Sequence, residues 1–438
     1  MTKGWLRTIA VGAGLTLVAG ACGGRDADDE AATDDGGDTA TTAGGEGGGE
    51  GGGELEPVAG FDGTTIRLGA LTPTSGRVAV IGNPLTAGNQ AYFDYVNEEL
   101  GGIAGQYPIE LVVRDTAYAE PTAVQEYNAT KDDVVMYAQI LGTPIVNALV
   151  GQLTTDGVVA APASLDSFWV REQSLLPVGG PYQIQAINAL DYWVTDGGGE
   201  GDVICSLIQD DPYGEAGQEG LDFAAEELDI ELGPAVTFPT GNPDFTTQIS
   251  QLEGAGCEMV LLVSTPADTG AALGKAAEVG FAPQWIGQSP SWIGLLALSP
   301  LAPYLEENFL LASEGPDYGD ESVPGMAELI RIQETYSEQP PDTYFNFGYL
   351  QAVAVTQVLE AAVANGDLSH EGIIEAMNGI EVFEYDGLSG DYEWGPPEDR
   401  NPPRTSTIFR VNPAAPTGLE AVEVDIESDA ALAFEFEE

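Results

Sequence analysis

An alternation of apolar β-type segments with helical segments, which occurs twice along the chain, is the feature that most limits its fold. In the first series, residues 65–71, 109–115 and 134–141 are strand-like, and helical stretches at 86–100 and from residue 121 separate them. Strands that are apolar along their whole length are typical of parallel sheets covered by helices on both faces. The pattern therefore predicts an α/β fold built on parallel sheets.

The same pattern begins again near Asp202, which indicates a second unit. Strand-like segments at 203–208, 235–238, 259–263 and 284–287 alternate with helical ones. The roughly 370 residues of this region exceed one ordinary domain. The whole chain is 43% apolar, which is enough for substantial cores. We therefore expect two doubly wound lobes, each with its own parallel sheet.

The N-terminus has the features of a secretory signal. Lys3 and Arg7 precede an apolar run at 8–19, and small residues lead to Cys22. The run is shorter than the roughly 20 residues that span a membrane, so we expect a signal peptide at 1–21. Residues 18–22 resemble the lipobox of bacterial lipoproteins, in which the Cys is lipidated and becomes the first residue. That resemblance implies a lipid anchor on Cys22 at the outer face of the cell membrane; the alternative is an ordinary signal peptide with a chance Cys.

Both ends of the mature chain are acidic and have little to bury. Residues 22–63 are rich in Gly, Glu and Thr, a composition typical of a disordered, extended tether. Residues 426–438 are expected to form an acidic C-terminal tail. A tether directly after the lipid-bearing Cys22 would hold a folded body away from the membrane.

The net charge of the chain is −58, with only 13 Lys and Arg residues. Nucleic-acid binding depends on basic side chains that contact phosphate, so this composition excludes a nucleic-acid partner. So acidic a surface repels itself unless salt screens it. We therefore expect halophilic adaptation, with a salt-rich habitat.

Signatures of catalysis are missing from the sequence. The chain has one His, His370, at the expected start of a helix, where a surface role is the simplest interpretation. No His, Cys and carboxylate cluster has metal-binding spacing, and no phosphate-binding loop or nucleophile motif occurs. We therefore expect no enzyme, no catalytic residue, no metal and no cofactor.

Hydroxyl-rich turns follow successive strands in both halves. Ligands of open α/β sheets bind beyond the carboxyl ends of the strands, so these turns are candidates for a binding site. Each turn alone is weak, because Ser, Thr and Pro also form ordinary turns. The residues predicted to contact a ligand are Ser75, Thr143, Ser164, Tyr213, Thr265 and Ser289.

From about residue 64 to 413 the chain resembles the branched-chain amino-acid receptors among the type I periplasmic binding proteins. The resemblance is carried by Leu68-Gly69-Ala70 with the turn at 72–76, the turn at 210–214, and the segments 245–249 and 280–287. It implies two lobes joined by a three-segment hinge, with the ligand between them.

The resemblance also sets the expected domain boundaries and partners. Lobe one is expected at 64–180 and 316–388, and lobe two at 181–315 and 389–425. The protein would be a monomeric, extracytoplasmic receptor that delivers a small-molecule solute to the permease of an ABC importer. A receptor that signals to a sensory partner is a second hypothesis, and an enzyme on the same scaffold is a third.

Departures from the family pattern bear on the ligand. Ser289 stands near the position of the acidic residue that pairs the ligand ammonium in amino-acid receptors, and Ile145 and Val146 replace hydroxyl residues after Gly142. Burying an ammonium without a counter-charge costs several kcal/mol. Either Asp210 or Asp268 serves instead, or the ligand is a related amide, carboxylate or aromatic compound. Trp169 and Trp292 would suit an apolar ligand, or they belong to the core.

Cys205 and Cys257 are predicted to form a disulfide within lobe two. Cys205 lies in the first strand of that lobe and Cys257 just before a later strand. These strands are neighbours in a doubly wound sheet, so the Cα separation of roughly 6 Å that a disulfide needs is within reach. The alternative is a pair of free thiols, with Cys205 as a core residue.

Overall fold

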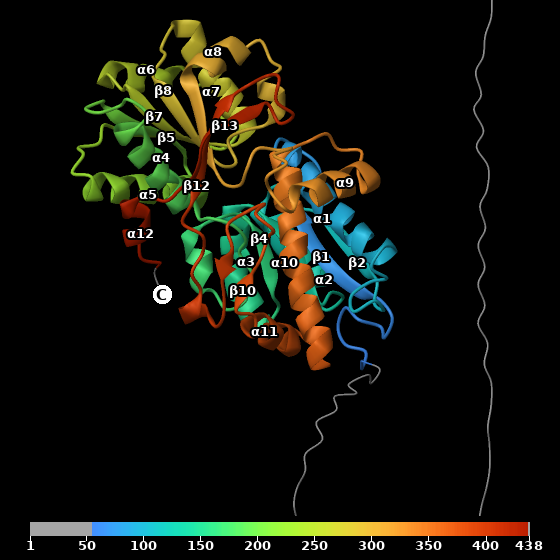
Figure 1. The fold of residues 1–438 in the computed structure, drawn as a ribbon. Coiled ribbons are helices and arrows are strands. Elements are labelled where there is room, and N and C mark those ends of the chain that lie inside the picture. The colour runs from blue at the N-terminus through green and yellow to red at the C-terminus, as the bar shows by residue number, and fades with distance from the viewer. Residues whose placement is uncertain (1–54, 437–438) are drawn as a thin grey trace, which may run out of the picture. The chain divides into compact units, whose positions relative to one another are not determined.

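The computed structural model of the protein describes residues 55–436. The predicted signal peptide, Cys22 and most of the predicted tether lie outside these residues. The described chain forms two α/β lobes, each built around its own sheet (Figure 1). The expected fold class, two lobes with largely parallel sheets, is confirmed.

Lobe one is built around a four-stranded parallel sheet with the order β2-β1-β3-β4. Its strands are β1 (Ile66–Thr72), β2 (Ile109–Asp115), β3 (Met136–Leu141) and β4 (Ala160–Ala163). Its helices are α1 (Ala79–Glu98), α2 (Glu120–Thr130), α3 (Thr143–Asp156), α9 (Met326–Tyr336), α10 (Thr343–Asn365) and α11 (His370–Asn378). Every residue of β3 is buried, as its largely apolar sequence predicts, and the one side-chain amide in it, Gln139, donates a hydrogen bond to the Thr72 hydroxyl.

Helices α1 and α10 pack closely against each other. A Cβ at Gly88 would lie 2.1 Å from the Phe345 carbonyl oxygen, and one at Gly348 would lie 1.9 Å from that of Leu85. The two glycines therefore let the helix backbones approach each other. Of the described helices, α10 is the one long and apolar enough to cross a membrane, and its apolar face is part of the lobe-one core.

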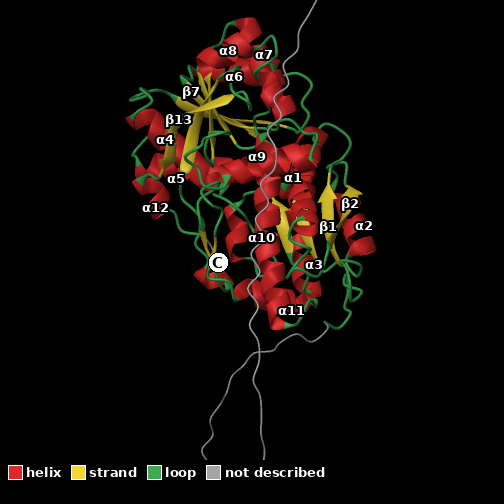
Figure 2. Ribbon diagram, turned by 45° about the vertical axis from the view of Figure 1, so that its right-hand side comes forward, coloured by secondary structure: helices red, strands yellow, loops and turns green. Residues whose placement is uncertain are grey.

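Lobe two contains a seven-stranded sheet with the order β13-β12-β9-β8-β7-β5-β6, in which β12 is antiparallel to its two neighbours. Its strands are β5 (Ile204–Gln209), β6 (Ala235–Phe238), β7 (Met259–Val263), β8 (Gln284–Gln288), β9 (Phe309–Ser313), β12 (Ser406–Val411) and β13 (Leu419–Ile426). Its helices are α4 (Tyr182–Thr195), α5 (Pro212–Glu227), α6 (Thr246–Ala255), α7 (Pro266–Val279), α8 (Ala302–Asn308) and α12 (Asp429–Ala433). Helices cover both faces of the sheet (Figure 2).

The last connection between the lobes lies later than the expected boundary at residue 389. Strands β10 (Val382–Phe383) and β11 (Tyr392–Glu393) pair with each other. Phe383, Tyr392 and Trp394 belong to the core of lobe one. The chain therefore returns to lobe two only after Trp394, because these aromatic residues bury their rings against lobe one.

The C-terminal segment, expected to be a tail, packs against lobe two as far as residue 436. Ser428 caps α12, and Phe434 and Phe436 lie in the lobe-two core. The Arg404 guanidinium donates hydrogen bonds to the carbonyl oxygens of Ala431 (2.6 Å) and Phe434 (2.7 Å). The segment differs from the expected tail because apolar residues lie between its acidic ones, and the rings of Phe434 and Phe436 are buried in the lobe-two core.

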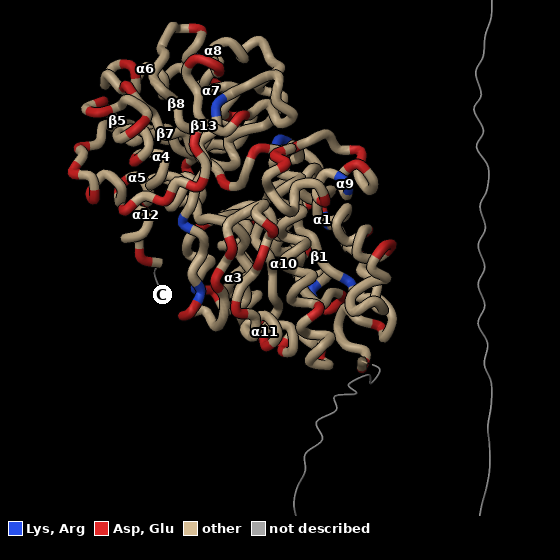
Figure 3. Tube along the Cα trace, viewed as in Figure 1, with Lys and Arg blue, Asp and Glu red and all other residues tan. Residues whose placement is uncertain are grey.

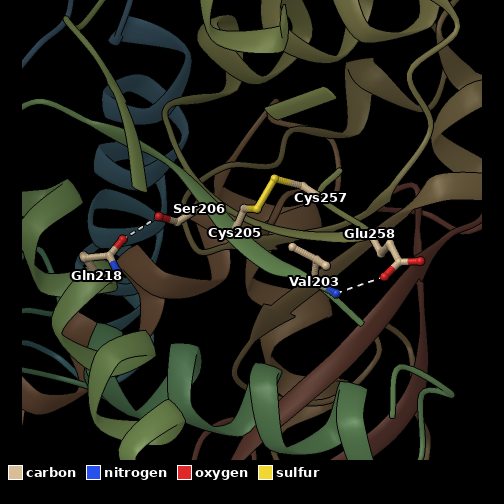
Figure 4. The surroundings of a disulfide bond; sticks show 6 residues. All are labelled: Val203, Cys205, Ser206, Gln218, Cys257 and Glu258. Atoms are coloured by element: carbon tan, nitrogen blue, oxygen red, sulfur yellow. Dashed lines mark hydrogen bonds between the residues drawn. A yellow bond between two sulfur atoms is a disulfide. The ribbon is translucent and has the colours of Figure 1, made fainter. Parts of the chain in front are cut away.

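The predicted disulfide between Cys205 and Cys257 is present in lobe two (Figure 4). Strands β5 and β7 are parallel neighbours, and the two Cα atoms lie 5.8 Å apart. A hydrogen bond from the Val203 N–H to the Glu258 carboxylate joins the same two segments. The disulfide therefore links two chain segments that already pair as neighbouring strands of the sheet.

Candidate ligand-binding cavity between the lobes

A cavity of about 1320 Å³, including its open mouth, lies between the two lobes. Most of its walls are apolar, and both lobes contribute to them. Apolar residues from lobe one include Ile81, Leu85, Leu141, Met326, Leu329 and Leu350, and those from lobe two include Pro290, Leu311, Phe409 and Leu419. An apolar lining with a few polar groups is typical of a small-molecule site.

One end of the cavity is polar because two neighbouring strands end there. Thr143 begins α3 directly after β3, and Ser164 follows β4. Their hydroxyl oxygens lie 2.7 Å apart, and the indole N–H of Trp169 donates to Ser164 at 3.3 Å. Gly142, with φ of 110°, turns the chain into α3. Helix α3 thus directs the positive end of its dipole toward this end of the cavity, although Pro144 in its first turn has no N–H group.

Tyrosines from lobe two close the same end. The rings of Tyr182 and Tyr213 are 4.9 Å apart, and the Tyr213 hydroxyl donates to the Ser289 carbonyl oxygen at 3.1 Å. Burial raises the pKa of Tyr213 well above its ordinary value, so its hydroxyl stays neutral. Tyr118 of lobe one also lines this end. The predicted site residue Tyr213 therefore faces the cavity as a neutral aromatic wall.

Thr265 and Ser289 also line the cavity, but the two acids suggested as ammonium partners do not. The Thr265 hydroxyl donates to Asp268 at 3.1 Å, and Asp268 also accepts a hydrogen bond from the Gly241 N–H. Asp210 is exposed at the surface. The structure therefore supplies no ammonium partner from either Asp.

Ser75, predicted as a ligand contact, lies outside the cavity lining. Its hydroxyl donates to Asp115 at 2.6 Å, and the backbone N–H of Thr74 donates to the same carboxylate. These bonds lower the pKa of Asp115 to about 2. Because Asp115 ends the adjacent strand β2, its carboxylate holds the turn after β1 at the surface. The other five predicted residues meet at the cavity.

Glu314 is a cavity residue that the sequence did not reveal. It follows β9 and is the one charged residue of the cavity wall. Its carboxylate accepts hydrogen bonds from the Gly180 N–H (2.7 Å) and the Ser389 hydroxyl (3.4 Å). Burial raises the pKa of Glu314 to about 7, although both hydrogen bonds lower it. Its position after an apolar strand and before Gly315 was the available signal, but Glu is frequent in this chain.

Helix α10 also contributes residues that the sequence did not single out. Thr343, Tyr344, Asn346, Phe347 and Leu350 line the cavity from lobe one. The sequence does not predict them, because an apolar helix is typical of a buried core and no local pattern shows which of its faces contacts a second lobe.

A family model described as periplasmic binding protein matches residues 65–416. The chain belongs to the periplasmic binding protein family. It is similar in structure to a fatty acid ABC transporter substrate-binding protein from Thermomonospora curvata, with 26% identity and a TM-score of 0.81 over 87% of this chain and 97% of that one. It also resembles a branched chain amino acid ABC transporter protein from Thermus thermophilus with bound valine, with 19% identity and a TM-score of 0.73 over 84% and 98% of the two chains. A leucine binding protein from Thermotoga maritima gives 16% identity and a TM-score of 0.69 over 82% and 98%. No curated protein sequence matches the chain significantly.

This binding protein is thus a type I, two-lobed receptor of the kind that serves ABC transporters outside the cytoplasm. Its lobes touch each other around the cavity. The Tyr344 hydroxyl of lobe one lies within hydrogen-bond distance of the Pro290 and Trp292 carbonyl oxygens of lobe two. Arg77 of lobe one lies 4.0 Å from Asp268 of lobe two. The lobes are thus in contact across the cavity, and this arrangement is referred to below as the closed form.

The cavity wall of this binding protein has one carboxyl group and no basic side chain. No group of three or more His, Cys, Asp or Glu residues suited to a metal ion occurs within the described part of the chain. The residues that line the cavity include neither His, Lys nor Arg. The wall therefore offers neutral hydroxyls, backbone amides, one carboxyl group and apolar surface, which suits binding.

Proposed function

We propose that this binding protein captures an amphipathic carboxylate with an apolar tail, of the fatty-acid kind, and delivers it to the permease of an ABC importer. The observation that carries the proposal is the cavity wall. It combines a small hydroxyl-rich end with a long apolar surface and has no acidic group at the ammonium position, where Ser289 stands.

The polar end suits the head of such a solute. A carboxylate beside Thr143 and Ser164 would accept a hydrogen bond from one of the two hydroxyls, since the other hydroxyl donates within the pair, and it would lie at the N-terminus of α3. A helix N-terminus favours an anion, and hydrogen bonds to an ionised group contribute about 1.5–3 kcal/mol each. An amide head would use the same donors with less electrostatic gain.

The apolar surface suits the tail. Apolar side chains of both lobes line the cavity, among them Phe347 and Leu350 of α10 and Leu311 and Phe409 of lobe two. Burying one CH₂ group contributes about 0.8 kcal/mol. An acyl chain would place its CH₂ groups against these side chains.

An α-amino acid fits the cavity less well. Its ammonium group would need a counter-charge, but Asp210 and Asp268 lie outside the wall, and Glu314, the one carboxyl group in the wall, already accepts hydrogen bonds from Gly180 and Ser389 and has its pKa raised by burial. The similarity to a fatty acid receptor at 26% identity agrees with this preference, and the similarity to the valine-bound protein, at 19%, concerns the fold alone.

Calorimetry with the delipidated protein tests the proposal. We expect decanoate and hexadecanoate to bind, decanamide to bind more weakly than decanoate, and leucine not to bind. Each CH₂ added between hexanoate and decanoate should lower Kd about threefold to fourfold. The proposal would be contradicted if leucine bound more tightly than decanoate, or if Kd did not change with the length of the acyl chain.

The lipid anchor on Cys22 belongs to the same proposal. It is supported by the sequence around Cys22 and by the extracytoplasmic role of the family. The mass of the native protein should exceed that of residues 22–438 by a diacylglyceryl group. A Cys22→Ser variant that stays in the membrane fraction would count against the anchor. We also expect the protein to act as a monomer, which the sedimentation coefficient would show.

A further inference from the structure

Glu314 lies where the connections between the two lobes meet. It follows β9 in the second connection, and its carboxylate accepts a hydrogen bond from the Gly180 N–H of the first. A Cβ at Gly180 would lie 3.4 Å from the carbonyl oxygens of Pro403 and Thr405, so this residue also packs against the third connection. A movement of the lobes about this hinge therefore changes the surroundings of Glu314.

The carboxyl group of Glu314 is tightly packed against its surroundings. Gly179, with φ of 83°, leaves room for it, because a Cβ there would lie 2.3 Å from both carboxyl oxygens. The Oε1 atom is buried and has no hydrogen-bond partner. An ionised carboxylate in this position is incompletely solvated, which is costly in the protein interior.

No positive charge compensates Glu314. It takes part in none of the ion pairs found among the described residues. The titratable group that faces it is the Tyr385 hydroxyl, which is neutral because burial raises its pKa, with a further contribution from Glu314. On the Gly180 and Ser389 sides it meets neutral hydrogen-bond donors.

The two lobes enclose Glu314 together. It lines the cavity, so parting of the lobes at the Tyr344 and Arg77 contacts would admit water to it. In the closed form burial raises the pKa of this carboxyl group to about 7. In an open, hydrated form the pKa returns toward its ordinary value, since desolvation is the dominant cause of the shift.

We infer that Glu314 takes up a proton from solvent when the lobes close over a solute, so that solute capture is coupled to protonation of the hinge. For a carboxylate solute, the inference rests on the proposed function. A bound carboxylate and an ionised Glu314 would be like charges in one cavity whose wall has no cation, which makes the neutral acid still more favourable.

The sign of the pH dependence follows from the direction of the shift. The closed form has the higher pKa for Glu314, so protons favour closing. Affinity is therefore highest in acid, falls as the pH rises through the range between the open and closed values, and levels off above about pH 7. For decanamide, which does not titrate itself, we expect Kd to rise at least about tenfold from pH 5.5 to pH 7.5.

Calorimetry of the full chain at pH 6.5, in buffers of different ionisation enthalpy, measures the proton directly. Binding of decanamide should take up more than about half a proton in the wild type and almost none in Glu314→Gln. Asp342→Asn is the matched control. Asp342 is a second buried acid, with its pKa raised to about 6, but it caps α10, and Asn keeps the cap. This control should retain the proton uptake.

The outcomes separate the two proposals. Proton uptake and pH dependence that persist in a folded Glu314→Gln would overturn the inference. Failure of decanoate and decanamide to bind would instead reject the proposed solute class.

Small-angle scattering then tests the hinge without a solute: the apo wild type should contract more than Glu314→Gln on acidification from pH 7.5 to pH 5.5. If Glu314→Gln does not fold, Ser389→Ala should move the midpoint to higher pH, because it removes a hydrogen bond to the carboxylate; an unchanged midpoint would count against the coupling.

Discussion

At the scale of single residues, the hydroxyls of Thr143 and Ser164 are the best-placed groups for the head of a solute. Both are buried, yet both line the cavity. Each also has a protein partner, since they bond to each other and Trp169 bonds to Ser164. The pair is thus held in place before a solute arrives, which lowers the entropic cost of binding.

Ser164→Ala should weaken decanoate binding about tenfold to 150-fold, because it removes one hydrogen bond of about 1.5–3 kcal/mol to the ionised head group. Ser75→Ala is the control, since Ser75 is exposed outside the cavity. Calorimetry on both variants gives the comparison. A larger effect at Ser75 than at Ser164 would show that the head group lies at the turn after β1 and not beside Ser164.

Tyr213 has a larger structural role than its sequence position indicated. It is 3% exposed, belongs to the lobe-two core and packs on Tyr182. Tyr213→Ala removes this ring from the lobe-two core and from the cavity wall. With this burial, the same change should lower the free energy of unfolding by about 3 kcal/mol, as truncation of a buried aromatic residue does. A urea melt of the apo variant measures the loss, and an unchanged midpoint would contradict the packing role.

At the scale of elements, the hinge depends on glycines at positive φ. Gly179 has φ of 83° and no room for a Cβ beside Glu314. Gly319 has φ of 93° and nothing within 4 Å of its Cβ position. Alanine substitutions at the two positions therefore distinguish the cost of backbone strain alone from the cost of strain plus a steric clash.

Gly179→Ala should destabilise the closed form more than Gly319→Ala destabilises its loop. Both carry the strain of a left-handed residue, roughly 1 kcal/mol, but only the first displaces the Glu314 carboxyl group. Thermal melts and decanoate affinity measure the difference. Equal effects at the two positions would mean that Glu314 moves aside without cost.

At the scale of the whole molecule, the charge is the dominant property. Acidic residues are spread over both lobes, and Lys and Arg are few (Figure 3). Several of the basic residues are used inside the structure: Arg400 is buried with its guanidinium over Trp394, and Arg404 holds the C-terminal segment. Little positive charge is left to balance the surface.

Salt should therefore stabilise the folded protein. Raising NaCl from about 0.1 M to 1 M shortens the Debye length from about 10 Å to 3 Å and screens the repulsion among surface carboxylates. We expect Tm to rise over this range, most steeply at its lower end. A Tm that does not change up to about 2 M NaCl would exclude a halophilic adaptation.

The sequence alone determined the layout of strands and helices, the two lobes and the disulfide. These depend on local apolar patterns and on the order of neighbouring strands, which short segments carry by themselves. It also predicted five of the six hydroxyl and tyrosine positions at the cavity, because strand ends of a parallel sheet meet at one edge.

Only the tertiary structure decided the rest. The capture of Ser75 by Asp115, the late return to lobe two after Trp394 and the packing of the C-terminal aromatics each depend on a partner far away in sequence. Glu314 is the clearest case. Its partners, Gly180 and Ser389, lie 134 and 75 residues from it, and its unusual protonation follows from the burial that they create. A local pattern shows that a carboxylate is present, but its solvation is a property of the folded hinge.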